Sequence, residues 1–315
     1  MKVLVFRGGA LGDFLLTLPT LVALRSAYPQ AEIYLFGTMP QARLAHPFPA
    51  TATYDLNGGA LTSLFRSGEF PAQPWVDAVR NADLALSYLF DPDKVVAGNL
   101  ARLGVGRLVV GPSRVDERGP HALEQLAFPV NALLGRVALG WPTLPIAVDR
   151  GQENSRHPLA LHVGSGARAK NWPVSHWADL VRQLRKVLPE QPVTLVCGEA
   201  DAAATDEFLA RLPDLQVECW RGLPLPELAG RLSRCRALLG HDSGISHLAA
   251  AAGTPVFALF GPTNPEVWAP RGPDVKVIRA PTRRLPELDP GAVWAEFWPW
   301  LQQPHGSRQA RPTEG

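Results

Sequence analysis

Short apolar runs alternate with helix-forming stretches along the first half of the chain, and this alternation restricts the possible folds more than any other feature. The apolar runs predict strands at 3–6, 31–36, 52–56, 84–89 and 107–110. The stretches between them predict helices at 14–27, 74–81, 94–103 and 123–134. Strands and helices that alternate in this way indicate βαβ units and a parallel sheet covered by helices.

The same pattern starts again after a proline-containing segment at 135–158, which we interpret as a domain boundary. Further strands are predicted at 159–163, 193–196, 216–219, 237–239, 256–259 and 275–280, with a long amphipathic helix at 175–188. We therefore predict two doubly wound α/β domains, at 1–150 and 151–285, then a helix at 286–303 and a flexible tail at 304–315. Domains of this kind bind ligands at the carboxyl ends of their strands.

The composition is that of a globular protein without a general affinity for nucleic acid. Of 315 residues, 46% are hydrophobic and 19% are charged, and the formal net charge is only +2. Cys197, Cys219 and Cys235 show no C-x-x-C spacing, so we expect buried thiols in a reducing compartment rather than disulfides or a zinc site. The sequence contains no signal peptide and no apolar run of about 18 residues, so we expect a cytoplasmic protein without a membrane span.

A turn of small residues leads into a predicted helix within 240–264, and this segment indicates an anion site. Asp242 and Ser243 are favourable N-cap residues. The unpaired N–H groups and the dipole of a helix start favour negative charge, so phosphate is the expected ligand. His241 and His247 are poorly spaced for a metal, and Ser243 lacks the G-x-S-x-G frame of a hydrolase nucleophile. We expect His247 to be a packed residue that supports the site rather than a proton carrier.

A glycine-rich basic loop at 164–170 is a second candidate anion site, because it follows a predicted strand and precedes a helix. Its small residues, Ser165 among them, let backbone N–H groups approach a phosphate, while Arg168 and Lys170 supply positive charge. The alternative is a solvated basic loop without a ligand.

Two acids also follow predicted strands. The loop GGALGD at 8–13 fits neither a dinucleotide-binding fingerprint nor a P-loop, and it ends in Asp13. Asp13 either caps the next helix, which is worth about 1 kcal/mol, or acts as a general base. Glu199 follows the strand at 193–196 and either hydrogen-bonds a ribose or caps the next helix together with Asp201.

Three segments together resemble glycosyltransferase family 9, the bacterial lipopolysaccharide heptosyltransferases. They are LGD at 11–13 with TLP at 17–19, KNWP at 170–173, and the stretch from DSGISHL at 242–248 through FGPT at 260–263. These motifs lie in both predicted domains, and their combination is specific although no single motif is. Between about residues 36 and 159 only the general βα pattern matches.

The resemblance implies an α/β protein of GT-B fold, with two Rossmann-like domains facing across a central cleft and the helix at 286–303 packed back on the N-terminal domain. It implies transfer of heptose from ADP-heptose to a lipopolysaccharide-core glycolipid, with inversion and without a metal or other cofactor. Asp13 is then the general base, and Lys170 is a catalytic residue that contacts the donor phosphates. Asp242 holds the donor sugar, and Glu199 binds the ribose. The diphosphate is received by the amides of Ser243, Gly244 and Ile245.

Several alternatives remain open at this point. Related heptosyltransferases often carry several hydroxyl side chains in the phosphate loop, whereas here Ser165 is the one hydroxyl residue of 164–167. A transferase for another nucleotide sugar, a non-catalytic nucleotide-sugar-binding protein and a nicotinamide-dependent oxidoreductase are the rivals. The resemblance also implies an acceptor associated with the inner membrane surface, and the basic side chains that could contact that surface are Arg283, Arg284, Arg308 and Arg311.

Overall fold

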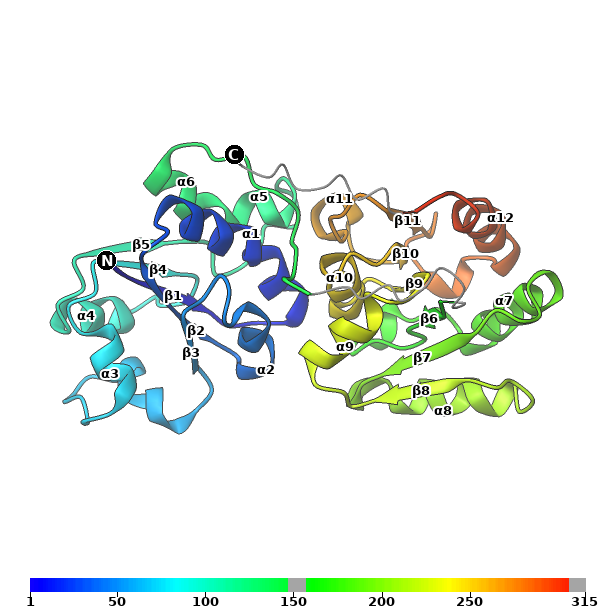
Figure 1. Ribbon diagram of the computed structural model, residues 1–315, viewed down its shortest axis with the longest axis horizontal. Helices are drawn as coiled ribbons and strands as arrows, with labels where there is room; N and C mark the ends of the chain where they lie inside the picture. The colour runs from blue at the N-terminus through cyan, green and yellow to red at the C-terminus, as the bar shows by residue number, and fades with distance from the viewer. Residues whose placement is uncertain (147–156, 306–315) are drawn as a thin grey trace. The chain divides into compact units, whose positions relative to one another are not determined.

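The computed structural model describes residues 1–146 and 157–305, and its contacts divide the chain into two compact units (Figure 1). The first unit is Met1–Pro145 with Pro224–Pro226, and the second is Ile146–Leu223 with Glu227–Gly315. The boundary predicted between residues 150 and 151 lies outside the described residues, as does most of the tail predicted at 304–315.

The first unit contains a parallel sheet with the strand order β3-β2-β1-β4-β5. Its strands are β1 (Lys2–Arg7), β2 (Glu32–Gly37), β3 (Ala52–Asp55), β4 (Leu84–Ser87) and β5 (Arg107–Val110). Its helices are α1 (Leu11–Ala27), α2 (Met39–Ala42), α3 (Pro74–Val79), α4 (Val95–Arg102), α5 (Ala122–Leu126) and α6 (Phe128–Leu134), with 3-10 turns η1 (Arg43–Ala45) and η2 (Gly59–Phe65). The predicted parallel sheet is confirmed for this unit.

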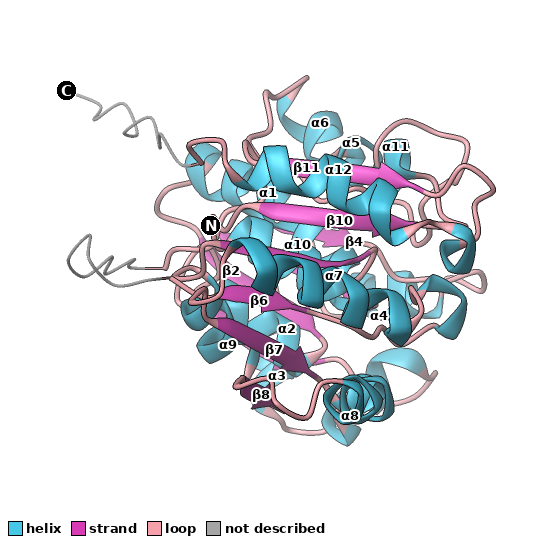
Figure 2. Cartoon of the chain, turned by 90° about the vertical axis from the view of Figure 1, so that its right-hand side faces the viewer, coloured by secondary structure: helices cyan, strands magenta, loops and turns pink. Residues whose placement is uncertain are grey.

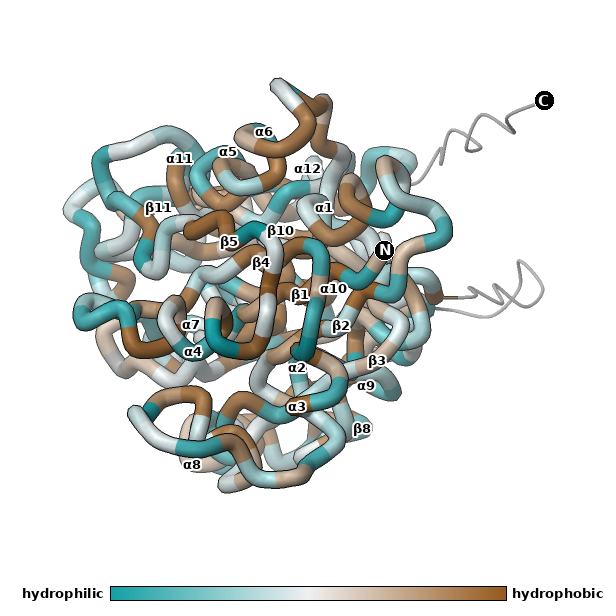
Figure 3. The backbone as a smooth tube through the Cα atoms, turned by 90° about the vertical axis from the view of Figure 1, so that its left-hand side faces the viewer, coloured by the Kyte–Doolittle hydropathy of each residue, from teal (hydrophilic) through white to brown (hydrophobic). Residues whose placement is uncertain are grey.

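Aromatic side chains in register hold the neighbouring strands of this sheet together. Phe6 of β1 pairs with Phe36 of β2, and Phe36 pairs with Tyr54 of β3. Their rings stack with centroids 4.6 Å and 4.8 Å apart, which adds to the apolar burial of the strand face. Figure 3 shows the hydrophobic character of the chain along β1 and β5.

One predicted helix of the first unit is interrupted. The stretch predicted as a single helix at 123–134 forms α5 and α6, which meet at Ala127. Pro129 lies in the first turn of α6. Because proline has no backbone N–H and its ring clashes with the preceding turn, it is tolerated at a helix start and not in a helix interior.

The second unit contains a parallel sheet with the order β11-β10-β9-β6-β7-β8. Its strands are β6 (Leu159–Leu161), β7 (Val193–Cys197), β8 (Glu218–Arg221), β9 (Ala237–His241), β10 (Val256–Phe260) and β11 (Val275–Arg279). Its helices are α7 (Val174–Val187), α8 (Ala202–Arg211), α9 (Leu225–Leu232), α10 (Gly244–Ala251), α11 (Pro265–Trp268) and α12 (Pro290–Leu301), with 3-10 turns η3 (Arg168–Lys170), η4 (Glu199–Asp201) and η5 (Leu285–Glu287). All the predicted strands are present, although β8 begins two residues later than predicted.

Helix α12 packs on the second unit. It contacts α7 and β11, and Figure 2 shows α7 and α12 together over the second sheet. Its buried side chains join the core of this unit, where Phe297 and Trp300 each lie with a ring centroid 5.4 Å from that of Phe257. The apolar face of α12 is buried within the second unit, against the aromatic side chains of β10, and packing of the helix at 286–303 on the N-terminal domain stays a prediction.

Candidate donor and base sites

In the second unit, the order of the strands places the two candidate anion segments next to each other. β6 lies between β7 and β9, so the connections from β6 and from β9 leave the sheet in opposite directions. Open α/β sheets bind ligands at such a switch point, beyond the carboxyl ends of the strands. The loop that contains Lys170 follows β6, and Asp242 and Ser243 follow β9.

Lys170 and Asp242 form an ion pair at this switch point. Lys170 Nζ lies 2.6 Å from Asp242 Oδ2. Thr263, beyond the end of β10, donates its hydroxyl to the same oxygen at 2.6 Å. Only 9% of the Asp242 side chain is exposed, whereas 31% of the Lys170 side chain remains accessible. The structure therefore joins two residues predicted separately for the donor site, and it adds Thr263, which the sequence motif contained without a role.

The start of α10 has the geometry expected of an anion site. Ser243 is its N-cap residue in an extended conformation, and its side chain makes no capping hydrogen bond. Gly244 and Ile245 occupy the first turn, where the N–H groups of a helix have no intrahelical acceptors. The N–H groups of Ser243, Gly244 and Ile245 are the ones predicted to receive the diphosphate. His247, one turn further on, is buried, in agreement with the expectation of a packed residue.

A buried neutral imidazole ties the Lys170 loop to the end of β9. His241 Nε2 accepts a hydrogen bond from the Trp172 backbone N–H at 2.8 Å, and its Nδ1 lies 3.4 Å from the Gly164 carbonyl oxygen. Burial lowers the pKa of His241 to about 3, against the opposing effects of the Gly164 carbonyl and Asp201. His241 thus fixes both ends of the loop.

Ser165 is buried inside this loop. Its hydroxyl oxygen lies 2.6 Å from Asn171 Oδ1 and 3.1 Å from the Ala167 carbonyl oxygen, both of them acceptors. The contacts of Ser165 seen here hold the loop in shape, and its predicted role as a phosphate ligand stays a prediction. Gly164 has a packing role, since a Cβ there would lie 2.8 Å from Asp201 Cβ.

A second buried pair, which sequence reasoning did not find, lies beside Ser243 at the candidate donor site. His162 Nε2 is 2.8 Å from Asp201 Oδ2, and His162 Nδ1 is 3.3 Å from Ser243 Oγ. The Gly198 N–H also donates to Asp201 Oδ2, at 3.0 Å. Burial acts to raise the pKa of Asp201, but the hydrogen bonds from His162 and from the Gly198 N–H help to outweigh it, and the pKa is lowered. The 39 residues between His162 and Asp201 conceal this contact in the sequence.

Glu199 is exposed at the carboxyl end of β7, where it begins η4. It does not cap α8, whose N-cap residue is Asp201, and the Asp201 side chain makes no capping bond to that helix either. The predicted capping by Asp201 is instead present at the start of η4, which leads directly into α8, because the Asp201 carboxylate accepts the N–H of the N-cap residue Gly198 at 3.0 Å. The predicted ribose contact of Glu199 stays a prediction.

In the first unit, the corresponding switch point lies between β1 and β4. Asp13 follows β1 there, in the first turn of α1. The N-cap residue of α1 is Ala10, and Asp13 lies in the first turn of the helix. The alternative in which Asp13 is an N-cap is thus wrong, because the helix already begins at Leu11. Gly9 makes the preceding turn with φ +103°, a conformation that favours glycine.

A buried arginine lies behind Asp13. Arg7 Nη2 is 3.3 Å from Asp13 Oδ1, and Arg7 Nε donates to Thr17 Oγ1 at 3.1 Å. The Thr17 hydroxyl in turn donates to the Asp13 carbonyl oxygen at 2.9 Å, and the Arg7 guanidinium lies 5.4 Å from the centre of the Tyr88 ring. Burial lowers the pKa of Arg7, against the opposing effects of Asp13 and Tyr88. Asp13 is consequently held as a partly exposed carboxylate with a buried cation beside it.

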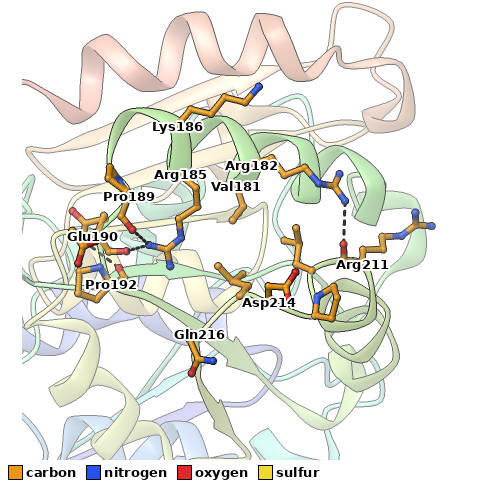
Figure 4. Close-up of a pocket in the computed structure, with 14 residues that line it drawn as sticks. Val181, Arg182, Arg185, Lys186, Pro189, Glu190, Pro192, Arg211, Asp214 and Gln216 are labelled. Carbon is orange, nitrogen blue, oxygen red and sulfur yellow. Dashed lines mark hydrogen bonds between the residues drawn. The ribbon is translucent and has the colours of Figure 1, made fainter.

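A cavity of about 950 Å³ lies elsewhere on the second unit (Figure 4). Pro192 and Gln216 place it at the amino ends of β7 and β8, the opposite edge of the sheet from Lys170 and Asp242. Its arginines have structural partners: Arg185 donates to the carbonyl oxygens of Pro189 and Gln191, and Arg182 donates to that of Arg211. We therefore do not assign it to the donor site.

The described residues were also compared with what a metal site, a membrane-spanning helix or a basic membrane-contact surface requires. Within residues 1–146 and 157–305, no three His, Cys, Asp or Glu side chains gather as metal ligands would. None of the helices described there has the length and apolar character needed to cross a bilayer. Arg284 pairs with Glu287 at 2.8 Å, and both side chains are exposed. Arg308 and Arg311 lie outside the described residues.

Comparison with known proteins decides the family. The model of glycosyltransferase family 9 (heptosyltransferase) matches residues 122–293, more than half of the chain. The chain belongs to glycosyltransferase family 9. Membership argues against the oxidoreductase alternative and confirms the resemblance drawn from the motifs.

Lipopolysaccharide heptosyltransferases are among the relatives of this chain, in agreement with its family. The chain is 29% identical over 297 residues to lipopolysaccharide heptosyltransferase 1 of Pseudomonas aeruginosa, a match to 84% of this chain and 80% of that protein. It is 35% identical over 115 residues to lipopolysaccharide heptosyltransferase 2 of Salmonella typhimurium, a match to 35% of this chain and only about a third (32%) of that relative's length.

The solved structure of the Escherichia coli ADP-heptose LPS heptosyltransferase II has the same fold. The two chains superpose with a TM-score of 0.76 at 21% identity, over 96% of this chain and 98% of the other. Together with the two parallel-sheet units, this likeness confirms the predicted α/β fold of GT-B type.

Proposed function

We propose that this chain is a glycosyltransferase that transfers heptose from ADP-heptose to a sugar of a lipopolysaccharide core. The observation that carries the proposal is the Lys170–Asp242–Thr263 cluster beside the start of α10, at the switch point of the second sheet. The proposal is supported by family membership and by the heptosyltransferases among the relatives of this chain.

The second unit is proposed to bind the donor. The N–H groups of Ser243, Gly244 and Ile245 receive the diphosphate, and Lys170 adds a positive charge near it. The Asp242 carboxylate, held by Lys170 and Thr263, orients the hydroxyls of the donor sugar. Glu199, exposed after β7, binds the ribose.

The departing ADP gains negative charge as the bond to the anomeric carbon breaks. Lys170 and the α10 amides stabilise that charge, so we propose that the reaction proceeds without a metal ion. Oxyanion-type donors of this kind contribute about 3 kcal/mol each to the transition state.

Asp13 is proposed to be the general base. It takes the proton from the attacking hydroxyl of the acceptor sugar, and direct attack of that hydroxyl on the anomeric carbon inverts the configuration. Its carboxylate is partly exposed and its cation, Arg7, is buried behind it, so one face remains free for an acceptor. The glycolipid acceptor, the cytoplasmic location and the contact with the inner membrane surface stay predictions.

The test is turnover of ADP-heptose with an extracted lipopolysaccharide-core acceptor by the wild type and by Asp13→Asn. The variant is expected to lose turnover while its affinity for ADP stays within about twofold, because general-base catalysis contributes about 100-fold or more. Asp83→Asn is the matched control, since Asp83 lies at the amino edge of the same sheet and accepts the Lys2 N–H.

Near-normal kcat in Asp13→Asn would refute the base assignment. Nucleotide binding without turnover on any core acceptor would favour the non-catalytic alternative. A thermal-shift panel of nucleotide sugars distinguishes ADP-heptose from another donor, because a donor that binds more tightly stabilises the folded state more at the same concentration.

A further inference from the structure

We propose that Asp201, His162 and Ser243 form a proton-linked relay in which His162 takes up a proton when a nucleoside diphosphate binds at the start of α10. The protonated imidazole then strengthens the hydrogen bond that the Ser243 hydroxyl donates to a phosphate oxygen. This inference rests on the proposed function, because it requires the diphosphate to bind where the α10 amides are.

The geometry of the three residues fixes which atoms hold protons. Asp201 Oδ2 accepts from the Gly198 N–H and lies 2.8 Å from His162 Nε2, so the imidazole presents its Nε2 proton to an ionised carboxylate. The remaining nitrogen, Nδ1, faces Ser243 Oγ at 3.3 Å. His162 and Asp201 are both buried, so bulk water does not compete for these contacts.

The site can therefore exist in two states that differ by one proton. Without a ligand, Nδ1 is unprotonated and accepts the Ser243 O–H. With a diphosphate bound, a proton from solvent adds to Nδ1, and Nδ1–H donates to Ser243 Oγ. The hydroxyl proton of Ser243 is then free to donate to a phosphate oxygen. No covalent bond to phosphorus or carbon changes in this exchange, and the proton returns to solvent when ADP leaves.

The groups around His162 keep their charge states when a diphosphate binds, so the change in charge comes from the diphosphate itself. From η4, Asp201 is ionised in both states, since its pKa is lowered. From β9, His241 is neutral because its pKa is low, and Gly240 packs against the imidazole stem, since a Cβ there would lie 3.3 Å from His162 Cβ. Beyond Ser243, the charge of Asp242 is balanced by Lys170.

In this arrangement His162 carries a positive charge only while the diphosphate is bound. A permanent cation in a buried site costs desolvation energy in the unliganded protein. A histidine with a buried carboxylate behind it becomes cationic by taking one proton from solvent. His162 and Asp201 thus act as positioning residues for Ser243, which alone among the three contacts the phosphate.

Titration calorimetry of the full chain with ADP tests the relay through a quantity that a merely structural role does not change. Binding is measured at about pH 8, above the second ionisation of a phosphate, in two buffers that differ in ionisation enthalpy. The difference in the observed heats gives the number of protons taken up. The wild type is expected to take up a measurable fraction of a proton per ADP.

The variants are His162→Gln and Asp201→Asn. In His162→Gln, the new amide can still donate to the Asp201 carboxylate but cannot take up a proton. In Asp201→Asn, the new amide oxygen still accepts from the Gly198 N–H, but no anion faces the imidazole. Both variants are expected to lose the proton uptake and to bind ADP about 10- to 100-fold more weakly, as the loss of a charge-assisted hydrogen bond predicts.

His305→Gln is the matched control, because His305 lies 3.6 Å from Asp274 in another histidine–aspartate pair of this unit. It is expected to show the proton uptake of the wild type. Equal uptake in the wild type and in His162→Gln, or none in the wild type, would overturn the relay while the donor site stands. Failure of the wild type to bind ADP would instead overturn the proposed function, and the relay with it.

Discussion

The neutrality of His241 makes the stability of the second unit depend on pH. In the folded protein the pKa of His241 is about 3, because the imidazole is buried, whereas an unfolded histidine titrates near about 6.5. Below about pH 6.5 the unfolded chain binds a proton that the folded protein does not, so the free energy of unfolding falls as the pH falls.

The size of this effect follows from the difference between the two pKa values. One pKa unit corresponds to about 1.36 kcal/mol, so His241 is expected to cost about 2 kcal/mol at about pH 5 relative to neutral pH. The full effect, reached near about pH 3, is about 5 kcal/mol. It acts directly on the proposed donor site, because the same imidazole accepts the Trp172 N–H in the Lys170 loop.

The assay is urea unfolding of the wild type and of His241→Gln at about pH 7.5 and about pH 5, followed by tryptophan fluorescence. The ring centroid of Trp177 lies 5.2 Å from that of His241, so the local signal reports on this region. At neutral pH the variant is expected to be less stable by about 1–3 kcal/mol, since a buried hydrogen bond is disturbed.

The two proteins are expected to converge at the lower pH, because glutamine does not titrate. His46→Gln, a change of an exposed histidine in the first unit, serves as the control and should follow the wild type. Parallel pH dependences for the wild type and His241→Gln would show that the buried imidazole is not the group responsible.

Two further predictions concern the ion pairs of the two units. Lys170→Met is expected to weaken ADP binding by about 10- to 100-fold and to lower kcat, because a cation near the diphosphate is lost. It should also cost about 1–2 kcal/mol of stability, below the range of about 3–5 kcal/mol for a fully buried pair, since 31% of the Lys170 side chain is exposed. Unchanged affinity in an ADP titration would remove Lys170 from the donor site. Arg7→Met is expected to lower kcat, because the buried guanidinium that lies 3.3 Å from the Asp13 carboxylate is gone. Thr17→Val, which keeps Arg7 and removes only the hydrogen bonds of the Thr17 hydroxyl to Arg7 and to the Asp13 carbonyl oxygen, should lower kcat less, and equal losses in the two variants would contradict this account.

The positions of the strands, and of residues that directly follow them, could be predicted from the sequence because they depend on local hydrophobic pattern. Apolar runs and helix-forming stretches located the strands, and the rule that ligands lie at the carboxyl ends of parallel strands selected Lys170 and Asp242, which are 72 residues apart. Their ion pair is therefore a consequence of topology. The same reasoning placed Asp13 after β1.

Contacts that depend on side-chain packing could not be predicted in this way. The burial of Arg7 behind Asp13 follows from the neighbouring Tyr88 ring, which no spacing rule links to β1. Likewise, His162 and Asp201 lie on different βα connections, and their contact depends on the close packing of the two loops at Gly164.

The anchoring of Trp172 implies an order in which the donor site is completed during synthesis. The indole N–H of Trp172 donates to the Leu288 carbonyl oxygen at 2.8 Å, across 116 residues, and α12 follows directly after this point. A nascent chain that has emerged from the ribosome only as far as β11 has its first sheet ready to fold. The proposed nucleotide site, however, still lacks the backbone that holds Trp172. Translation that stops there should therefore leave the Lys170 loop without its anchor at the Leu288 carbonyl oxygen.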